Sequence, residues 1–277
     1  MQAATIKTEM GSNETNKPNK QRLTSAIYAE YPVLFARACG IDPDPWQEQV
    51  LNSESKRILL NNCRQSGKSS IVAIMAIHHA LYTSDAMIIV ISHTLQQAGE
   101  TFRKIIDAYK QRGKPVVSET QTVHRLDLKN GSRVVTLTGQ APDSIRGFSN
   151  VSLLIVDEAA QVPDDAYFAA RPMLAVSEGR IVLLSTPHGQ QGFFANAWFN
   201  ESEWEKYEVN ADQCPRLSKE FLAEEKALYP NWFFNQEYYN EFSLNQDSVF
   251  TEADINAALS HPELYVRNEI DLSLDNL

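Results

Sequence analysis

Residues 57–81, RILLNNCRQSGKSSIVAIMAIHHAL, combine a short apolar run, a Gly-Lys-Ser turn and a long apolar segment with helical spacing. A phosphate-binding loop of the pattern G-x-x-x-x-G-K-[ST] has this layout, because backbone N–H groups and a helix N-terminus must point at the same phosphate oxygens. Asn62 stands where the first glycine belongs, and we expect Asn to be tolerated because it adopts positive φ more readily than other non-glycine residues. The flanking strand and helix disfavour the alternative, a chance tripeptide with an exposed lysine.

Each position of this loop has an expected task. Gly67 permits a close approach of the backbone, Lys68 neutralises phosphate charge, and Ser69 is expected to hold magnesium. Arg64 is unusual inside such a loop and adds a fixed fork of donors near the phosphates. The candidate nucleotide-binding residues of the loop are therefore Arg64, Gln65, Ser66, Gly67, Lys68, Ser69 and Ser70.

The pattern around the loop predicts an α/β fold. Short apolar or β-branched runs occur at residues 57–61, 86–92, 151–156 and 180–185, and helical patterns occur at 68–82 and 95–111. Strands that alternate with helices imply parallel strands joined by crossovers.

Two segments depart from this alternation. VHRLDLKNGSRVVTLTG, around Asn130-Gly131, alternates apolar and polar residues and predicts an antiparallel hairpin. From about Val209 onward the pattern is helical, with Pro230 at the start of the second segment.

The N-terminal sequence and the composition further limit the class of protein. Residues 1–22 are polar and predict a disordered tail, and residues 23–40 carry one helical pattern that ends at Gly40. No apolar run approaches the length of a membrane span and the N-terminus does not resemble a signal peptide, so we expect a cytosolic protein. The net charge of -10 argues against coating nucleic acid by bulk attraction, although it permits a local basic surface.

The run VSLLIVDEAAQVP places two acids at the end of a buried strand. A nucleotide hydrolase needs a carboxylate near magnesium and a group that orients or activates water. We expect Asp157 to hold the magnesium and Glu158 to orient or activate the attacking water. The alternative is that two acids simply end a strand and meet solvent.

RIVLLSTPHGQQG ends another strand in small hydroxyls, Ser185 and Thr186, followed by Pro187. The carboxyl ends of strands are where α/β sheets hold ligands, so these residues are candidates for sensing the γ-phosphate. A plain turn at this position is the alternative, and His188 alone is no evidence for catalysis.

Two further places have two interpretations each. Trp46 and Gln47, ahead of the first strand, either contact an adenine ring or are a buried aromatic and its neighbour after a helix-start proline. Arg146 is either a structural ion-pair partner or an arginine finger that reaches a phosphate in a neighbouring subunit.

Taken together, Trp46-Gln47, CRQSGKSS, SIRGFSNVSLLIVDEAA and LLSTPHG resemble the ATPase part of a large terminase subunit, the DNA-packaging motor of tailed bacteriophages and herpesviruses. The resemblance spans residues 40 to 250, and the order and spacing of four motifs make it specific. It implies a P-loop NTPase of the additional-strand catalytic-glutamate (RecA-like) type, with a mainly parallel sheet flanked by helices and a small helical lid.

The resemblance also assigns roles by position. Lys68 and Ser69 match residues that bind phosphate and magnesium, and Arg64 matches a loop arginine characteristic of the family. Asp157 matches the magnesium ligand and Glu158 the catalytic carboxylate. The remaining matches are Gln47 to the adenine-contacting glutamine, Ser185, Thr186 and Pro187 to the coupling motif, and Arg146 to a trans-acting finger.

The family further implies ATP and Mg²⁺ as cofactors, with double-stranded DNA, a portal protein, a small terminase subunit and further copies of the chain in a ring as partners. It implies action in the cytoplasm of an infected bacterial host, with no membrane partner. We expect a tail at 1–22, an ATPase core at 23–208 and a helical lid or linker at 209–277. The family's C-terminal nuclease needs well over a hundred further residues, so we expect the motor half only, with 251–277 as the start of a connection and no DNA cleavage.

Two other functions compete with a DNA-translocating ATPase. A superfamily 2 helicase is disfavoured because no second set of strands is predicted after Asn200. A nucleotide-dependent assembly protein, in which ATP only orders a subunit contact, is separated from a motor by measuring hydrolysis in Glu158→Gln.

Overall fold

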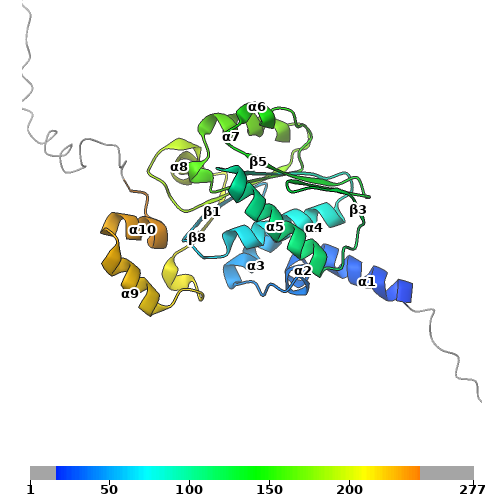
Figure 1. Ribbon diagram of the computed structural model, residues 1–277, viewed down its shortest axis with the longest axis horizontal. Helices are drawn as coiled ribbons and strands as arrows, with labels where there is room; N and C mark the ends of the chain where they lie inside the picture. The colour runs from blue at the N-terminus through cyan, green and yellow to red at the C-terminus, as the bar shows by residue number, and fades with distance from the viewer. Residues whose placement is uncertain (1–16, 244–277) are drawn as a thin grey trace, which may run out of the picture.

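The computed structural model describes residues 17–243, with side chains from residue 22 onward. In this part of the chain eight strands form one sheet in the order β3-β4-β5-β2-β6-β7-β1-β8 (Figure 1). The strands are β1 (Arg57–Asn62), β2 (Met87–Ser92), β3 (Ser118–Gln121), β4 (Arg125–Leu128), β5 (Arg133–Thr138), β6 (Leu153–Asp157), β7 (Arg180–Ser185) and β8 (Glu205–Val209). The helices are α1 (Lys17–Glu30), α2 (Pro32–Ala38), α3 (Pro45–Asn52), α4 (Lys68–Tyr82), α5 (Leu95–Gln111), α6 (Pro142–Ile145), α7 (Asp164–Ala170), α8 (Gly192–Phe199), α9 (Lys219–Leu228) and α10 (Asn231–Tyr239).

The six strands from β5 to β8 in the sheet order run parallel, as the alternation of strands and helices predicts. Their carboxyl ends therefore meet at one edge, where Asn61 of β1 lies opposite Ser185 of β7 and Asp157 of β6 lies opposite Leu184 of β7. The phosphate loop and the acidic pair thus emerge at the same edge of the sheet.

The predicted hairpin is confirmed, because β4 and β5 pair antiparallel on either side of Asn130 and Gly131. Gly131 has φ +82, and a Cβ there would clash with the Asp85 carboxylate, so the turn requires glycine. β3 adds an antiparallel edge strand to β4, and β8 adds a parallel strand beside β1. Neither β3 nor β8 is predicted from the sequence.

The N-terminal helix differs from the prediction in two ways. It begins at Lys17, so residues 17–22 of the expected tail are helical, while residues 1–16 lie outside the described part. Long straight-chain polar residues such as Lys, Gln and Arg lose little rotamer freedom in a helix, so the helix extends beyond its apolar positions. The single helix expected over 23–40 is broken at Tyr31, because Pro32 disfavours helical angles in the residue before it.

The strands β1, β2, β6 and β7 send alternate side chains into two separate cores. Ile58 and Leu60 of β1 pack in a cluster with α2, α3, α4 and α5, whereas Leu59 packs in a cluster with α6, α7 and α8. Figure 1 shows these two groups of helices on opposite faces of the sheet. Period-two alternation in a sheet covered on both faces explains the almost continuous apolar runs of these strands.

α9 and α10 lie apart from the two layers, beyond β8 (Figure 1). They enclose a small cluster of their own, with Phe234 and Tyr238 from α10 and Ala211 from the segment after β8. The two helical segments expected after Val209 are therefore confirmed as α9 and α10, the second of which ends at Tyr239. The expected connection at 251–277 lies outside the described residues.

Candidate active site

The loop between β1 and α4 has the shape of a phosphate cradle. Gly67 precedes α4 with φ +86 and Gln65 has φ +60, so the backbone reverses twice over three residues. Asn62 does not take positive φ; it is the buried last residue of β1, and our conformational reason for tolerating it is wrong. The reversal that the loop needs is supplied later, at Gln65 and Gly67.

Lys68 and Ser69 begin α4 and reach the acidic pair at the end of β6. The Lys68 ammonium lies 3.4 Å from Glu158 Oε1, and Ser69 Oγ donates to Asp157 Oδ1 at 3.4 Å. Lys68 is buried, with 6% exposure. Lysine is rarely buried unless it has a charged partner, and here Glu158 is that partner. Loop and acids therefore converge on one site. Ser70 sits one residue further along α4, where its amide donates to Gly67 O.

Asp157 is positioned by a residue that the sequence analysis does not identify. Thr101, a buried residue of α5, donates its hydroxyl to Asp157 Oδ2 at 2.7 Å. Burial and the neighbouring Glu158 raise the pKa of the Asp157 carboxyl, while the Thr101 hydroxyl and Lys68 lower it. Thr101 looks like any other polar residue of an amphipathic helix, so only its register on α5 could have indicated this contact.

Glu158 has an uncommon backbone conformation. Its φ of 54 and ψ of 46 lie in the left-handed region, which non-glycine residues occupy mainly at constrained sites. This turn sends its carboxylate back over the strand ends, where Oε1 faces Lys68 and Oε2 lies 3.5 Å from Ser185 Oγ. The alternative that the acids simply end a strand and meet solvent does not describe this geometry.

The residues predicted to form the coupling motif follow at the end of β7. Ser185 is fully buried and accepts a hydrogen bond from the Ala160 amide at 3.2 Å, while Thr186 is 5% exposed. Pro187 is buried beside them, and His188 is exposed at the rim of a separate cavity of about 290 Å³. Ser185 is thus in contact with Glu158, whereas His188 is not part of this site.

The Arg64 side chain contacts α10. Its Nε lies 2.5 Å from Glu237 Oε2, a close charge contact rather than an aligned hydrogen bond, and its amide donates to Glu237 O at 3.0 Å. Next to it, Asn61 Nδ2 donates to Asn240 O at 3.3 Å. α10 is therefore held directly against the end of β1 and the start of the loop.

Gln47 and Trp46 lie on α3 with different surroundings. Gln47 is buried against the loop, donates from Nε2 to Ser66 O at 3.3 Å, and accepts from the Asp44 amide at 2.9 Å. Trp46 packs against the core, and its indole N–H is buried without a partner. Gln47 therefore adjoins the nucleotide-binding loop, and Trp46 matches the buried-aromatic interpretation.

Arg146 lies outside this constellation. It follows α6 and is largely exposed, and its Nε lies 3.8 Å from Oδ1 of the fully exposed Asp143. Such a surface pair contributes little stability. The structure therefore does not hold Arg146 in a fixed ion pair, and its role as a finger stays a prediction.

The donor set fits the magnesium that the fold implies. Ser69 and Asp157 supply oxygen ligands of the kind this ion prefers, on adjoining elements. The described residues contain no group of three or more His, Cys, Asp or Glu side chains that could hold a metal. Magnesium in nucleotide sites takes one or two protein oxygens and completes its shell with phosphates and water.

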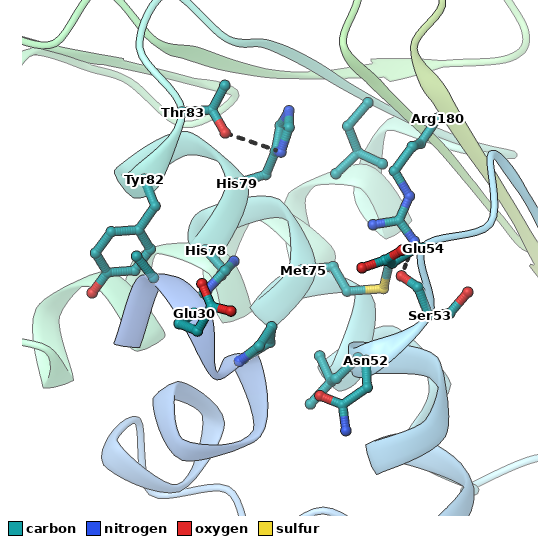
Figure 2. A pocket seen from close by; sticks show the side chains of 14 residues that line it. Glu30, Asn52, Ser53, Glu54, Met75, His78, His79, Tyr82, Thr83 and Arg180 are labelled. Atoms are coloured by element: carbon teal, nitrogen blue, oxygen red, sulfur yellow. Dashed lines mark hydrogen bonds between the residues drawn. The ribbon is translucent and has the colours of Figure 1, made fainter. Parts of the chain in front are cut away.

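A second cavity, of about 330 Å³, lies at the opposite edge of the sheet, where β6 begins at Leu153 and β7 at Arg180 (Figure 2). His78 and His79 project into it from the last turns of α4. Burial lowers the pKa of both imidazoles, to about 4 for His79. The cavity is separated from the candidate active site by the length of α4.

None of the helices in the described part of the chain is long and apolar enough to cross a membrane.

Comparison with known proteins relates this chain to one family. The family model described as "Terminase large subunit, T4likevirus-type, N-terminal" matches residues 59–257. The curated large terminase subunit of Thermus phage G20c is 24% identical over 257 residues, covering 80% of this chain and 53% of the relative. The chain thus spans about half the length of the curated relatives it matches.

Solved structures give the same fold. The large terminase ATPase domain of Thermus phage P74-26 superposes with a TM-score of 0.66 at 24% identity, covering 76% of this chain and 97% of that domain. The large terminase of a thermophilic bacteriophage, solved in complex with ADP, gives a TM-score of 0.60 at 14% identity, covering 72% of this chain and 54% of that one. These likenesses confirm the predicted P-loop NTPase fold.

Proposed function

The chain belongs to the terminase large subunit family, in its T4likevirus-type N-terminal part, and on this premise we propose that it is an ATP-hydrolysing motor domain that drives double-stranded DNA into a viral procapsid. The ADP complex of the large terminase from a thermophilic bacteriophage supports a nucleotide as ligand of this fold. The observation that carries the proposal is the convergence of Lys68 and Ser69, at the start of α4, with Asp157 and Glu158, at the end of β6, on one edge of the sheet.

The loop binds the triphosphate of ATP. Its amides and the N-terminus of α4 face the phosphate oxygens, and Lys68 neutralises the outer phosphates. Ser66 Oγ is buried in this loop without a hydrogen-bond partner. Ser69 and Asp157 would hold magnesium, which would supply positive charge to neutralise the charge that develops on the phosphates.

Glu158 orients and activates the attacking water. In the structure its carboxylate is occupied by Lys68 at 3.4 Å. A phosphate that takes Lys68 frees Glu158, so the base becomes available only when substrate is present. Ser185, 3.5 Å from Glu158 Oε2, keeps the carboxylate at the strand ends.

The state of the nucleotide is passed to α9 and α10. Arg64 pairs with Glu237 of α10, and phosphate oxygens near the loop compete for the same guanidinium. Ser185, Thr186 and Pro187 lie at the end of β7, beside β1, which carries the loop. Movement of α10 relative to the sheet is then the mechanical output of hydrolysis.

We propose the larger assembly by analogy with the family. We assign 23–208 to the ATPase core and 209–277 to a lid or linker, and we propose a ring of copies with Arg146 of one subunit serving the phosphates of the next. Double-stranded DNA, a portal protein and a small terminase subunit are its proposed partners, in the cytoplasm of an infected bacterium.

The test is steady-state ATP hydrolysis by wild type and Glu158→Gln, with ATP binding measured for both. Gln keeps the size of the side chain but cannot accept a proton, so we expect the rate to fall by about 10²- to 10⁴-fold while binding is retained. Glu178→Gln, an exposed surface change, is the matched control and should hydrolyse ATP like wild type.

Two outcomes contradict the proposal. Wild type that binds ATP but hydrolyses it no faster than Glu158→Gln would leave a nucleotide-dependent assembly protein as the better description. Full activity in Glu158→Gln would remove Glu158 from the catalytic role.

A further inference from the structure

Arg216 contacts the outer side of the phosphate loop from a segment that no motif identifies. It lies between the 3-10 turn η3 (Ala211–Gln213) and α9, at the start of the helical pair. Its Nε donates to Gln65 O at 3.2 Å, and its Nη2 donates to Ser66 O. One guanidinium therefore holds two successive carbonyl groups of the loop.

The guanidinium is itself fixed by the N-cap residue of α3, Asp44. Arg216 Nη2 donates to Asp44 Oδ2 at 2.6 Å, and the Asp44 side chain is 14% exposed. Gln47, in the first turn of α3, donates to the same Ser66 carbonyl. Three segments that are distant in sequence thus meet on the outer face of the loop.

The direction of these carbonyls determines where the loop amides point. In a planar trans peptide the C=O and the following N–H point in opposite directions. Holding Gln65 O and Ser66 O outward therefore turns the amides of Ser66 and Gly67 toward the inner side, where phosphate binds. The loop needs such support because Gln65 has positive φ, which costs free energy in a residue other than glycine.

The geometry points to Arg216 as a positioning residue for nucleotide binding, which sets the phosphate loop in its binding conformation and ties that conformation to the root of α9 and α10. This rests on the proposed function, since it concerns the same ATP site. Arg216 touches neither Glu158 nor Asp157, so its effect falls on nucleotide affinity rather than on the chemical step.

The experiment measures the dissociation constant for ATP and magnesium in the Glu158→Gln background, where hydrolysis is suppressed, and the kcat and KM for ATP in the otherwise wild-type chain. Arg216→Ala removes both carbonyl contacts, so we expect the dissociation constant and KM to rise about tenfold with kcat changed less than about twofold. Arg216→Lys supplies one point charge in place of the fork and should restore affinity only in part.

Arg180 provides the matched control. It also holds two backbone carbonyls, Ser55 O from Nε at 3.0 Å and Ser53 O from Nη2 at 2.8 Å, but at the opposite edge of the sheet. Arg180→Ala should lower the melting temperature and leave ATP affinity within twofold of wild type. Amide hydrogen exchange at Ser66 and Gly67, without nucleotide, should accelerate in Arg216→Ala and not in Arg180→Ala.

Three results overturn the inference. These are ATP affinity in Arg216→Ala within twofold of the background, an equal loss in Arg180→Ala, or unchanged exchange at Ser66 and Gly67. Should Arg216→Ala not fold, the same comparison is made with Arg216→Lys, where full wild-type affinity overturns it. If the wild-type chain fails to bind or hydrolyse ATP, the proposed function itself is refuted. That outcome is distinguishable from a failure of the Arg216 inference, which is seen only when the variants are compared with a wild-type chain that binds ATP.

Discussion

Acid pH should destabilise this protein through a histidine remote from the candidate active site. His79 lies in the cavity of Figure 2, with its Nε2 2.9 Å from Ser152 Oγ and its Nδ1 3.4 Å from Thr83 Oγ1. Burial, helped by Arg180 and His78, lowers the pKa of His79 from 6.5 to about 4. The carboxylates of Glu30 and Glu54 line the same cavity without reversing this effect.

The direction and the size of this effect on the free energy of unfolding follow from the linkage between proton binding and folding. Between pH 6.5 and pH 4 the unfolded chain binds a proton at His79 that the folded chain does not, so the free energy of unfolding falls as the pH falls through this window. The full difference, at 1.36 kcal/mol per pH unit, is about 3 kcal/mol, of which about 2 kcal/mol is lost by pH 5. Above about pH 7 the contribution to stability is complete.

The assay is urea unfolding of wild type and His79→Gln, followed by tryptophan fluorescence at pH 7.5 and pH 5. Gln does not titrate in this range, so wild type should lose about 2 kcal/mol more than the variant between the two pH values. His188→Gln, an exposed change, should behave like wild type. If the pH dependences of wild type and His79→Gln agree within about 0.5 kcal/mol, the reasoning is refuted, because His79 would then titrate alike in the folded and unfolded chains.

Three further changes test the active site. Gly67→Ala places a Cβ 2.8 Å from Gln47 Nε2 at φ +86, so we expect ATP affinity to fall at least tenfold in an equilibrium titration, with wild-type affinity as the contradicting result. Glu237→Gln removes the charge that holds Arg64, so hydrogen exchange in α10 should accelerate, while the free energy of unfolding changes by about 1 kcal/mol or less. Unchanged hydrogen exchange would show that the pair does not fix α10. ATP hydrolysis per subunit should rise with protein concentration in wild type and stay flat in Arg146→Ala, and a flat wild-type profile counts against a finger acting between subunits.

Much of the fold follows from local patterns. β1, β2, β6 and β7 are buried on both faces, so their apolar runs are continuous and each lies within a residue or two of its predicted bounds. β3 and β8 are edge strands with mostly polar residues, SETQ and EKYEV, and their pairing depends on neighbours that are distant in sequence. Edge strands carry no apolar signature, which is why neither is predicted.

The residues of the candidate active site also divide into those that local sequence patterns predict and those that they do not. Lys68, Ser69, Asp157 and Glu158 are predictable because a phosphate loop and an acidic strand end each have a recognisable local form. The contacts of Thr101, Glu237 and Arg216 are not, because each joins segments that are far apart along the chain. Asn62 shows the limit of a motif, since the loop places its positive φ angles elsewhere.

β1 pairs in parallel with β8 over five residues, from Ile58 opposite Glu205 to Asn62 opposite Val209, and the Cys63 amide extends this ladder to Val209 O at 2.9 Å. The segment that leads to α9 and α10 therefore leaves the sheet from the strand adjoining the one that carries the phosphate loop. A pull on the helical pair along the strands loads these hydrogen bonds together in shear, instead of breaking them one at a time as peeling does. The root of the helical pair is thus built to transmit tension in one direction and to yield most easily sideways, away from β1.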